Sequence, residues 1–273
     1  MNTTTPAPCT DKRVAPMTTK RQYEIPWRAP PGVRIIDANI GVAHRIDQMD
    51  LTSDRDRLLR ELDDHGVSGA VVYHMLSDAY SPVDGNLLLT DWIGNEPRLT
   101  PLWGVVPTND SQSQVEGLIR DTHNHGVRYS VPRTIDLPFE PWVVGDLLTT
   151  LADLKAVLWI PISEVPVSQI VATLNDYPRL DVVLTGAHYT HHLWVRPLLT
   201  AMPRAHLELS RYEVFDDVRE LVREFGAERL MYGSGYPGYA MGPILLYLHH
   251  IELTDRQLAL IAGGNLERLM GQR

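Results

Sequence analysis

The chain has 273 residues, of which 44% are hydrophobic and 22% are charged, and its formal net charge is -9. This is the composition of a globular protein with a sizeable core, and the acidic balance argues against binding nucleic acid or an anionic membrane through bulk charge. The single cysteine, Cys9, excludes an internal disulfide framework and a cysteine-based zinc cluster.

The first segment, residues 1–33, differs from the rest of the chain. It is rich in threonine and proline and shows no regular hydrophobic period, so we interpret it as a disordered N-terminal arm. Residues 34–273 form the second predicted unit, a single folded domain. The chain has neither an apolar run near the ~18 residues that span a bilayer nor the apolar stretch of a secretory signal. We therefore expect a cytoplasmic protein.

From residue 34 onward, short apolar runs rich in β-branched residues recur along the chain. They are mostly apolar on both faces, which is typical of strands in a parallel sheet covered on both sides. The predicted strands are residues 33–37, 69–74, 100–106, 126–131, 155–160, 180–185, 205–209 and 228–233.

Helical patterns with recognisable ends lie between these runs. One begins near Ser53 and Asp56 and stops at Gly66, and Thr254 with Gln257 forms a capping box before another. Strands alternating with helices in this way predict an α/β fold, a (β/α)8 TIM-like barrel. A doubly wound open sheet is the alternative; it is less favoured because no glycine-rich phosphate loop follows any strand.

Several stretches carry a resemblance to a known family. GAERLMYGSGYPGY (226–239) and LTDRQLALIAGGNLERLM (253–270) resemble the closing pattern of the amidohydrolase-related family. RIIDANIGVAH (34–44) resembles its opening metal-binding motif, and YPRLDVVLTGAHYT (177–190) resembles its sixth strand. The resemblance covers about residues 34–270, and it implies a metal-dependent TIM-barrel hydrolase or decarboxylase of the amidohydrolase superfamily.

The departures from the family pattern concern the metal site. Asn39 and Gly41 stand where the family has two metal-binding histidines, and Gly235 stands where it has an aspartate. The family's fifth-strand histidine has no counterpart, and His188 is the histidine that matches its sixth strand. A catalytic zinc ion needs about three protein ligands. We therefore predict a degenerate metal site, with no catalytic metal and no other cofactor.

Three residues at predicted strand ends are candidates for metal-free proton transfer: Asp37, His74 and His188. Each also has a structural interpretation. Asp37 could bind neighbouring backbone, His74 could fill a polar layer, and His188 could belong to a loop with His191 and His192.

Further polar side chains near the strand ends are candidates for substrate binding. An arginine can clamp a carboxylate with two hydrogen bonds, although surface ion pairing is the alternative, and a buried glutamate needs a partner, for which Arg211 or Arg128 is available. The predicted substrate-binding residues are Asn39, Arg133, Glu208, Arg211 and Tyr236.

Three function classes stay open at this point. The chain is a metal-independent hydrolase or lyase acting on a small carbonyl or carboxylate compound, a non-catalytic pseudoenzyme that partners a metal-bearing homologue, or a small-molecule binding protein. No Gly-x-Ser-x-Gly motif indicates a serine hydrolase. The resemblance implies a homo-oligomer or a hetero-oligomer with a homologue, and the candidate contact residues are Trp142, Trp194, Leu245, Leu246 and Leu248.

Overall fold

The computed structural model of the chain describes residues 32–43, 54–131 and 135–271. Most of the predicted N-terminal arm lies outside these ranges, so its disorder stays a prediction. Arg133 and Ser53 also lie outside the described residues.

The strands run parallel to one another in chain order. The first sheet has the order β1-β2-β3 and the second the order β4-β5-β6-β7-β8-β9. Their bounds are β1 (Ile36–Val42), β2 (Gly69–His74), β3 (Leu99–Pro101), β4 (Trp103–Val105), β5 (Gly126–Tyr129), β6 (Val157–Pro161), β7 (Asp181–Thr185), β8 (Ala205–Glu208) and β9 (Leu230–Met231).

Every predicted strand is present, and the third one is divided into β3 and β4. The division falls at Leu102, whose backbone N–H still donates to the carbonyl of Val72 in β2. β3 pairs with β2, and β4 pairs with β5. The segment that contains β3 and β4 therefore forms hydrogen bonds with both neighbouring strands. The division is therefore a bend in one barrel strand.

The end of the chain closes the barrel against its beginning. The backbone N–H of Ala38 donates to the carbonyl of Tyr232 at 3.1 Å, and that of Gly41 donates to the carbonyl of Tyr236 at 2.8 Å. These bonds join the segment that follows β9 to β1. The α/β barrel predicted from the sequence is confirmed, and the open-sheet alternative is wrong.

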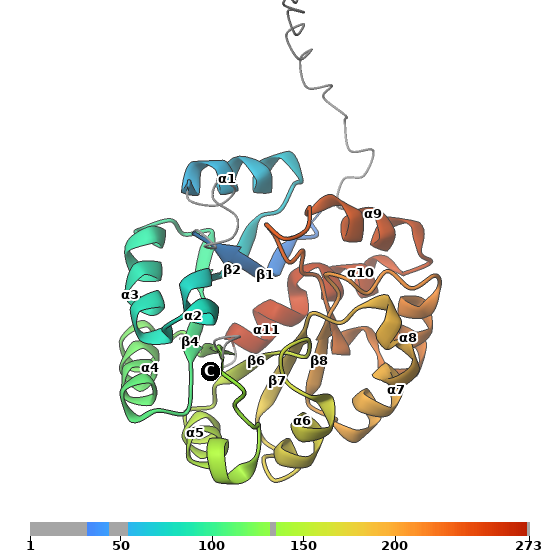
Figure 1. The fold of residues 1–273 in the computed structure, drawn as a ribbon. Coiled ribbons are helices and arrows are strands. Elements are labelled where there is room, and N and C mark those ends of the chain that lie inside the picture. Colours follow the sequence, from blue (N-terminus) through green and yellow to red (C-terminus); the bar gives the residue numbers. More distant parts are fainter. Residues whose placement is uncertain (1–31, 44–53, 132–134, 272–273) are drawn as a thin grey trace, which may run out of the picture.

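Most of the helices lie around the strands, and α11 lies near the centre of the view in Figure 1. Their bounds are α1 (Arg55–Asp64), α2 (Met75–Ala79), α3 (Pro82–Ile93), α4 (Asn109–Thr122), α5 (Pro141–Asp153), α6 (Val167–Leu174), α7 (His192–Ala201), α8 (Asp217–Phe225), α9 (Gly242–His250), α10 (Asp255–Ala259) and α11 (Asn265–Gly271). Short helical turns are η1 (Tyr189–His191), η2 (Ala227–Arg229) and η3 (Leu260–Gly264).

The helix ends follow local hydrogen bonding. Asp54 begins α1, because its side chain accepts from the backbone N–H of Asp56. The capping box before α10 is confirmed: the Thr254 hydroxyl accepts from the backbone N–H of Gln257, whose side chain accepts from that of Thr254. Among the described residues, no helix is long and apolar enough to span a bilayer.

An apolar cluster fills the interior of the barrel. It combines side chains from strands around the barrel with Leu266 and Leu269 of α11. Trp159 of β6 reaches across, and its indole N–H donates to the carbonyl of Ala38 in β1 at 3.0 Å. This packing leaves the carboxyl ends of the strands for polar side chains.

The predicted oligomer contact needs correction in part. Leu245 and Leu248 are 1% and 2% exposed and belong to the core. They are buried because they lie on the side of α9 that packs onto the barrel. Trp142 and Leu246 are exposed, and Trp194 is partly buried against the core.

Candidate functional site

A cavity of about 440 Å³ opens at the carboxyl ends of the strands. Its wall includes side chains from the ends of β1, β2, β5, β6 and β7, the segment after β8, helix α2, and residues 235–239 after β9. Barrels of this architecture place their active sites at this face. The cavity is therefore the candidate functional site.

A buried glutamate supports the floor of this cavity. Glu208 is fully buried at the end of β8. Its Oε2 accepts from the Asn39 amide Nδ2 and from the Ser210 hydroxyl, both at 3.0 Å, and its Oε1 accepts from the Ser210 backbone N–H at 2.6 Å. Asn39 and Ser210 border the cavity. Burial, reinforced by the negative charge of Asp37, raises the pKa of Glu208 to about 7.

The Glu208 side chain fits beside Gly233 because glycine has no side chain. A Cβ at Gly233 would lie 2.2 Å from Oε1 of Glu208, which is far inside van der Waals contact. Neither Arg128 nor Arg211 is among the hydrogen-bond partners of Glu208, so the sequence-based proposal that one of them pairs with it is wrong. Neutral amide and hydroxyl groups satisfy the glutamate because the arginines are engaged elsewhere.

Asp37 lies fully buried in β1 and ties this strand to the segment after β9. Its Oδ1 accepts from the backbone N–H groups of Asn39 at 2.9 Å and Ser234 at 3.0 Å. Burial raises the pKa of Asp37 to about 6, against the lowering effect of these hydrogen bonds. Asp37 itself does not border the cavity.

Arg128 of β5 presents a positive charge to the cavity. It is 4% exposed, and its guanidinium binds the Asp78 carboxylate through Nε at 3.1 Å and Nη2 at 2.8 Å. The guanidinium also lies 4.1 Å from the centre of the Tyr73 ring. Its Nη1 has no hydrogen-bond partner among the described residues. A fixed, buried guanidinium with an unused donor favours an anionic ligand.

A second arginine, Arg211, also lines the cavity. Arg211 donates from Nη1 to the Tyr239 hydroxyl at 2.6 Å, and its guanidinium lies 4.3 Å from the centre of that ring. Tyr236 also borders the cavity and is 9% exposed. The predicted binding residues Arg211, Tyr236 and Asn39 therefore all border one cavity.

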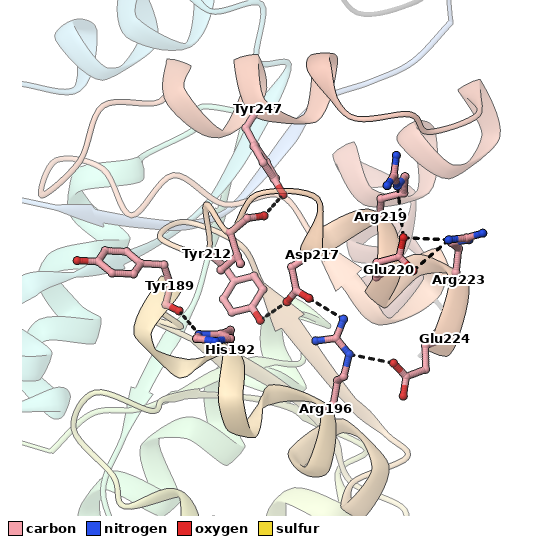
Figure 2. A network of polar contacts seen from close by, with 11 residues as sticks. Tyr189, His192, Arg196, Tyr212, Asp217, Arg219, Glu220, Arg223, Glu224 and Tyr247 are labelled. Carbon is pink, nitrogen blue, oxygen red and sulfur yellow. Dashed lines mark hydrogen bonds and ion pairs between the residues drawn. The ribbon is translucent and has the colours of Figure 1, made fainter.

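A polar network holds the segment that carries Ser210 and Arg211 in place (Figure 2). The hydroxyl of buried Tyr212 donates to Asp217 at the start of α8. Arg196 of α7 joins the Asp217 carboxylate at 2.6 Å to the Glu224 carboxylate at 3.0 Å. These contacts fix the connection between β8 and α8 beside the cavity.

The three predicted catalytic residues do not converge. His74 is 8% exposed and caps α2, where its Nδ1 accepts from the backbone N–H of Leu76; burial lowers its pKa. His188 lies with its Nδ1 3.0 Å from the Thr190 hydroxyl, at the start of η1. Neither histidine borders the cavity, and neither is bound to Asp37 by any hydrogen bond within the described part of the chain.

His188, the histidine that matches the family's sixth-strand metal ligand, lies three residues beyond the end of β7. β7 ends at Thr185, and Gly186 borders the cavity while His188 does not. His188 instead shares a reciprocal cap with His191, whose Nδ1 accepts its backbone N–H at 3.0 Å. The local turn therefore uses this histidine for backbone capping.

The remaining donors do not suit a divalent metal ion. A Cβ at Gly41 would lie 3.0 Å from Met75 Cγ and 3.1 Å from the Tyr73 hydroxyl, so these side chains fill the space of a larger residue there. In residues 32–43, 54–131 and 135–271, no group of three or more His, Cys, Asp or Glu side chains could hold a metal ion. The guanidinium of Arg128 adds repulsion of a cation. The residues present do not fit the metal that the fold family implies.

Comparisons with known proteins agree with this architecture. The family profile described as "Amidohydrolase" matches residues 55–272. A comparison with curated proteins found no match.

Solved structures resemble the chain over nearly their whole length. A 5-carboxyvanillate decarboxylase from Sphingomonas paucimobilis is 15% identical, with a TM-score of 0.68 over 88% of this chain and 99% of that one. A dihydroxybenzoic acid decarboxylase from a Polaromonas species, with bound manganese, is 12% identical, with a TM-score of 0.71 over 88% and 98%. A 2,6-dihydroxybenzoate decarboxylase from Rhizobium is 11% identical, with a TM-score of 0.68 over 88% and 99%. At these identities the likeness is one of fold.

Proposed function

The chain belongs to the amidohydrolase family, and from this membership and the cavity we propose that it acts, without a divalent metal, on a small carbonyl or carboxylate compound. The proposed enzyme is a hydrolase or a lyase. The compound binds at the carboxyl ends of the strands. The structural relatives named above are decarboxylases of aromatic carboxylic acids, which supports an aromatic carboxylate as the ligand class.

The unused donor of Arg128 carries the proposal. Nη1 is buried without a hydrogen-bond partner among the described residues, while Asp78 holds the rest of the guanidinium in a fixed orientation. Leaving a charged donor unsatisfied is costly. Because Arg128 borders the cavity, a ligand carboxylate there would give the guanidinium a second anionic partner, and Arg211 adds a second positive charge to the same cavity. Tyr73 and Tyr236 offer aromatic surface to the rest of the ligand.

We assign proton transfer to Glu208, which acts through two side chains that border the cavity, Asn39 and Ser210. Its pKa of about 7 allows it to give or take a proton near neutral pH. The Ser210 hydroxyl borders the cavity and donates to Oε2 of Glu208, and the Asn39 amide donates to the same oxygen. This arrangement is the acid–base machinery of the proposed reaction.

Isothermal titration with benzoate, 2-hydroxybenzoate and 2,6-dihydroxybenzoate, in buffer containing EDTA, tests the proposal. We expect saturable binding of at least one compound. Because a hydrogen bond to a charged group contributes about 1.5–3 kcal/mol, Arg128→Met should weaken binding by roughly 10-fold or more. Arg120→Met, the same change at a side chain that is 71% exposed, should leave binding unchanged. Binding only after metal is added, or equal binding by Arg128→Met, would contradict the proposal.

Binding without catalysis is a second candidate function. The observation that favours it is the complete burial of Asp37 and Glu208, whose carboxyl groups are engaged below the cavity floor. In this case the protein would act as a small-molecule binding protein or as a partner of a metal-bearing homologue. Prolonged incubation with a bound compound separates the two, because a binding protein returns the compound unchanged.

A further inference from the structure

Two serines border the cavity within the described ranges, Ser163 and Ser210, and their environments differ. Ser210 is 5% exposed, and its hydroxyl donates to Oε2 of Glu208 at 3.0 Å. Ser163 lies exposed at the cavity wall and makes no hydrogen bond to a carboxylate of the residues that the structure describes. Of these two serines, Ser210 is therefore the one whose hydroxyl is hydrogen-bonded to a carboxylate.

The base is itself held by other groups. The Asn39 amide donates to the same Oε2 at 3.0 Å, and the backbone N–H of Ser210 donates to Oε1 at 2.6 Å. Gly233 packs so closely on Glu208 that a Cβ there would overlap Oε1. A nucleophile in contact with a base, with that base oriented by a third group, is the general arrangement of covalent catalysis.

We infer that Ser210 is a nucleophile, with Glu208 as its base, and that it forms an acyl-enzyme with carboxylate-bearing esters or lactones held in the cavity. This inference rests on the proposed function, and it narrows the reaction to acyl transfer to water. The chain lacks a Gly-x-Ser-x-Gly motif, so the serine is identified by its contacts in the structure.

The chemical step uses only these groups and water. The Ser210 oxygen bonds to the substrate carbonyl carbon while its proton passes to Oε2 of Glu208, and the carbonyl oxygen takes the negative charge. When the carbonyl re-forms, the bond to the leaving oxygen breaks and that oxygen receives the proton from Glu208. Water then attacks the ester on Ser210, gives a proton to Glu208, and the serine hydroxyl is regenerated with that proton.

Two guanidinium groups are available to the negative charge that develops on the carbonyl oxygen. The guanidinium groups of Arg128 and Arg211 both border the cavity. Positive groups that are already fixed in position stabilise a developing oxyanion without reorganising. Asp78 fixes Arg128, and the Tyr239 hydroxyl accepts from Arg211.

Covalent labelling of the full chain with a small dialkyl fluorophosphonate tests the inference. Ser210 would bond to phosphorus, fluoride would leave, and Glu208 would take the hydroxyl proton. Cleavage after Arg204 and Arg211 releases the peptide of residues 205–211, in which Ser210 is the one serine. We expect one adduct per chain, located in this peptide by mass spectrometry.

Variants separate a nucleophile from a serine with a structural role. Ser210→Ala should lose the adduct, whereas Ser163→Ala should keep it. Glu208→Gln should slow labelling by roughly 100-fold or more, since general-base catalysis contributes about 10²–10⁴-fold. Glu208→Asp provides a second variant with a carboxylate, in case Glu208→Gln fails to fold as judged by circular dichroism.

The outcomes distinguish this inference from the proposed function. Absence of an adduct, or an adduct in another peptide, overturns the assignment of Ser210 even if carboxylates bind as proposed. An adduct at Ser210 that Glu208→Gln does not slow overturns the role of Glu208. An adduct at Ser210 in a protein that binds none of the carboxylates supports the nucleophile and contradicts the proposed ligand class.

Discussion

Replacing Glu208 by glutamine should change how the stability of the protein depends on pH. Burial raises the pKa of Glu208 from 4.5 to about 7, so the folded state holds this proton more tightly than the unfolded state. The resulting stabilisation is fully present below the unfolded pKa and is lost as pH rises through the folded pKa. At 1.36 kcal/mol per pKa unit, the difference corresponds to about 3 kcal/mol. Glutamine cannot ionise, so the variant lacks this loss.

Urea unfolding of both proteins across this range measures the effect. The free energy of unfolding of the native protein, relative to Glu208→Gln, should fall by about 3 kcal/mol between about pH 4 and about pH 8. Asp37 is present in both proteins, so its raised pKa affects both curves. Glu252→Gln, at a side chain that is 86% exposed, should give a curve parallel to that of the native protein. Parallel curves for native protein and Glu208→Gln would refute the reasoning.

Four further substitutions test the packing, the ion pairing and the helix capping of the fold. Gly233→Ala should destabilise the fold by roughly 1–3 kcal/mol in urea unfolding, because its Cβ would overlap Glu208. Gly117→Ala, where a Cβ meets nothing within 4 Å in α4, should instead stabilise by up to about 1 kcal/mol, and a loss there would contradict the reasoning. Arg128→Met should cost about 3–5 kcal/mol because it leaves the Asp78 carboxylate without its partner, and a thermal midpoint equal to that of the native protein would disprove this. Thr254→Ala should lower the free energy of unfolding by about 1 kcal/mol through loss of the helix cap, and an unchanged value would show that the cap is dispensable.

The sequence predicts the barrel well because each strand is covered on both faces. Apolar runs such as residues 180–185 leave little choice of secondary structure once their length and β-branched content are considered. The bend at Leu102 is not predictable in this way, because the run stays apolar while its hydrogen bonds pass from one neighbour to another. The capping box at Thr254 is local, and the sequence alone predicts it.

The sequence predicts the location of the candidate site better than it predicts the partners of the side chains in the site. Glu208 and Arg128 each stand as a charge within an apolar strand, which marks a side chain that points into the barrel. Their partners depend on packing between distant segments: Arg128 pairs with Asp78, 50 residues away. Ser210 gives no signal in the sequence beyond its place after a predicted strand.

The two histidines show where residue type alone misleads. His74 and His188 are plausible proton carriers by chemistry and by position at strand ends. In the structure both serve as caps, because their Nδ1 atoms accept backbone N–H groups at the start of helical turns. A capping role is decided by the backbone conformation at one residue, which the sequence pattern does not specify.

Elemental analysis of untagged protein, produced in medium supplemented with manganese and zinc, tests the central claim most directly. The cavity places guanidinium groups beside its floor and offers no set of three metal-binding side chains within the described part of the chain. We predict metal content far below one ion per chain, with no change on replacing Asn39 by alanine. Near-stoichiometric metal that disappears in Asn39→Ala would contradict the claim.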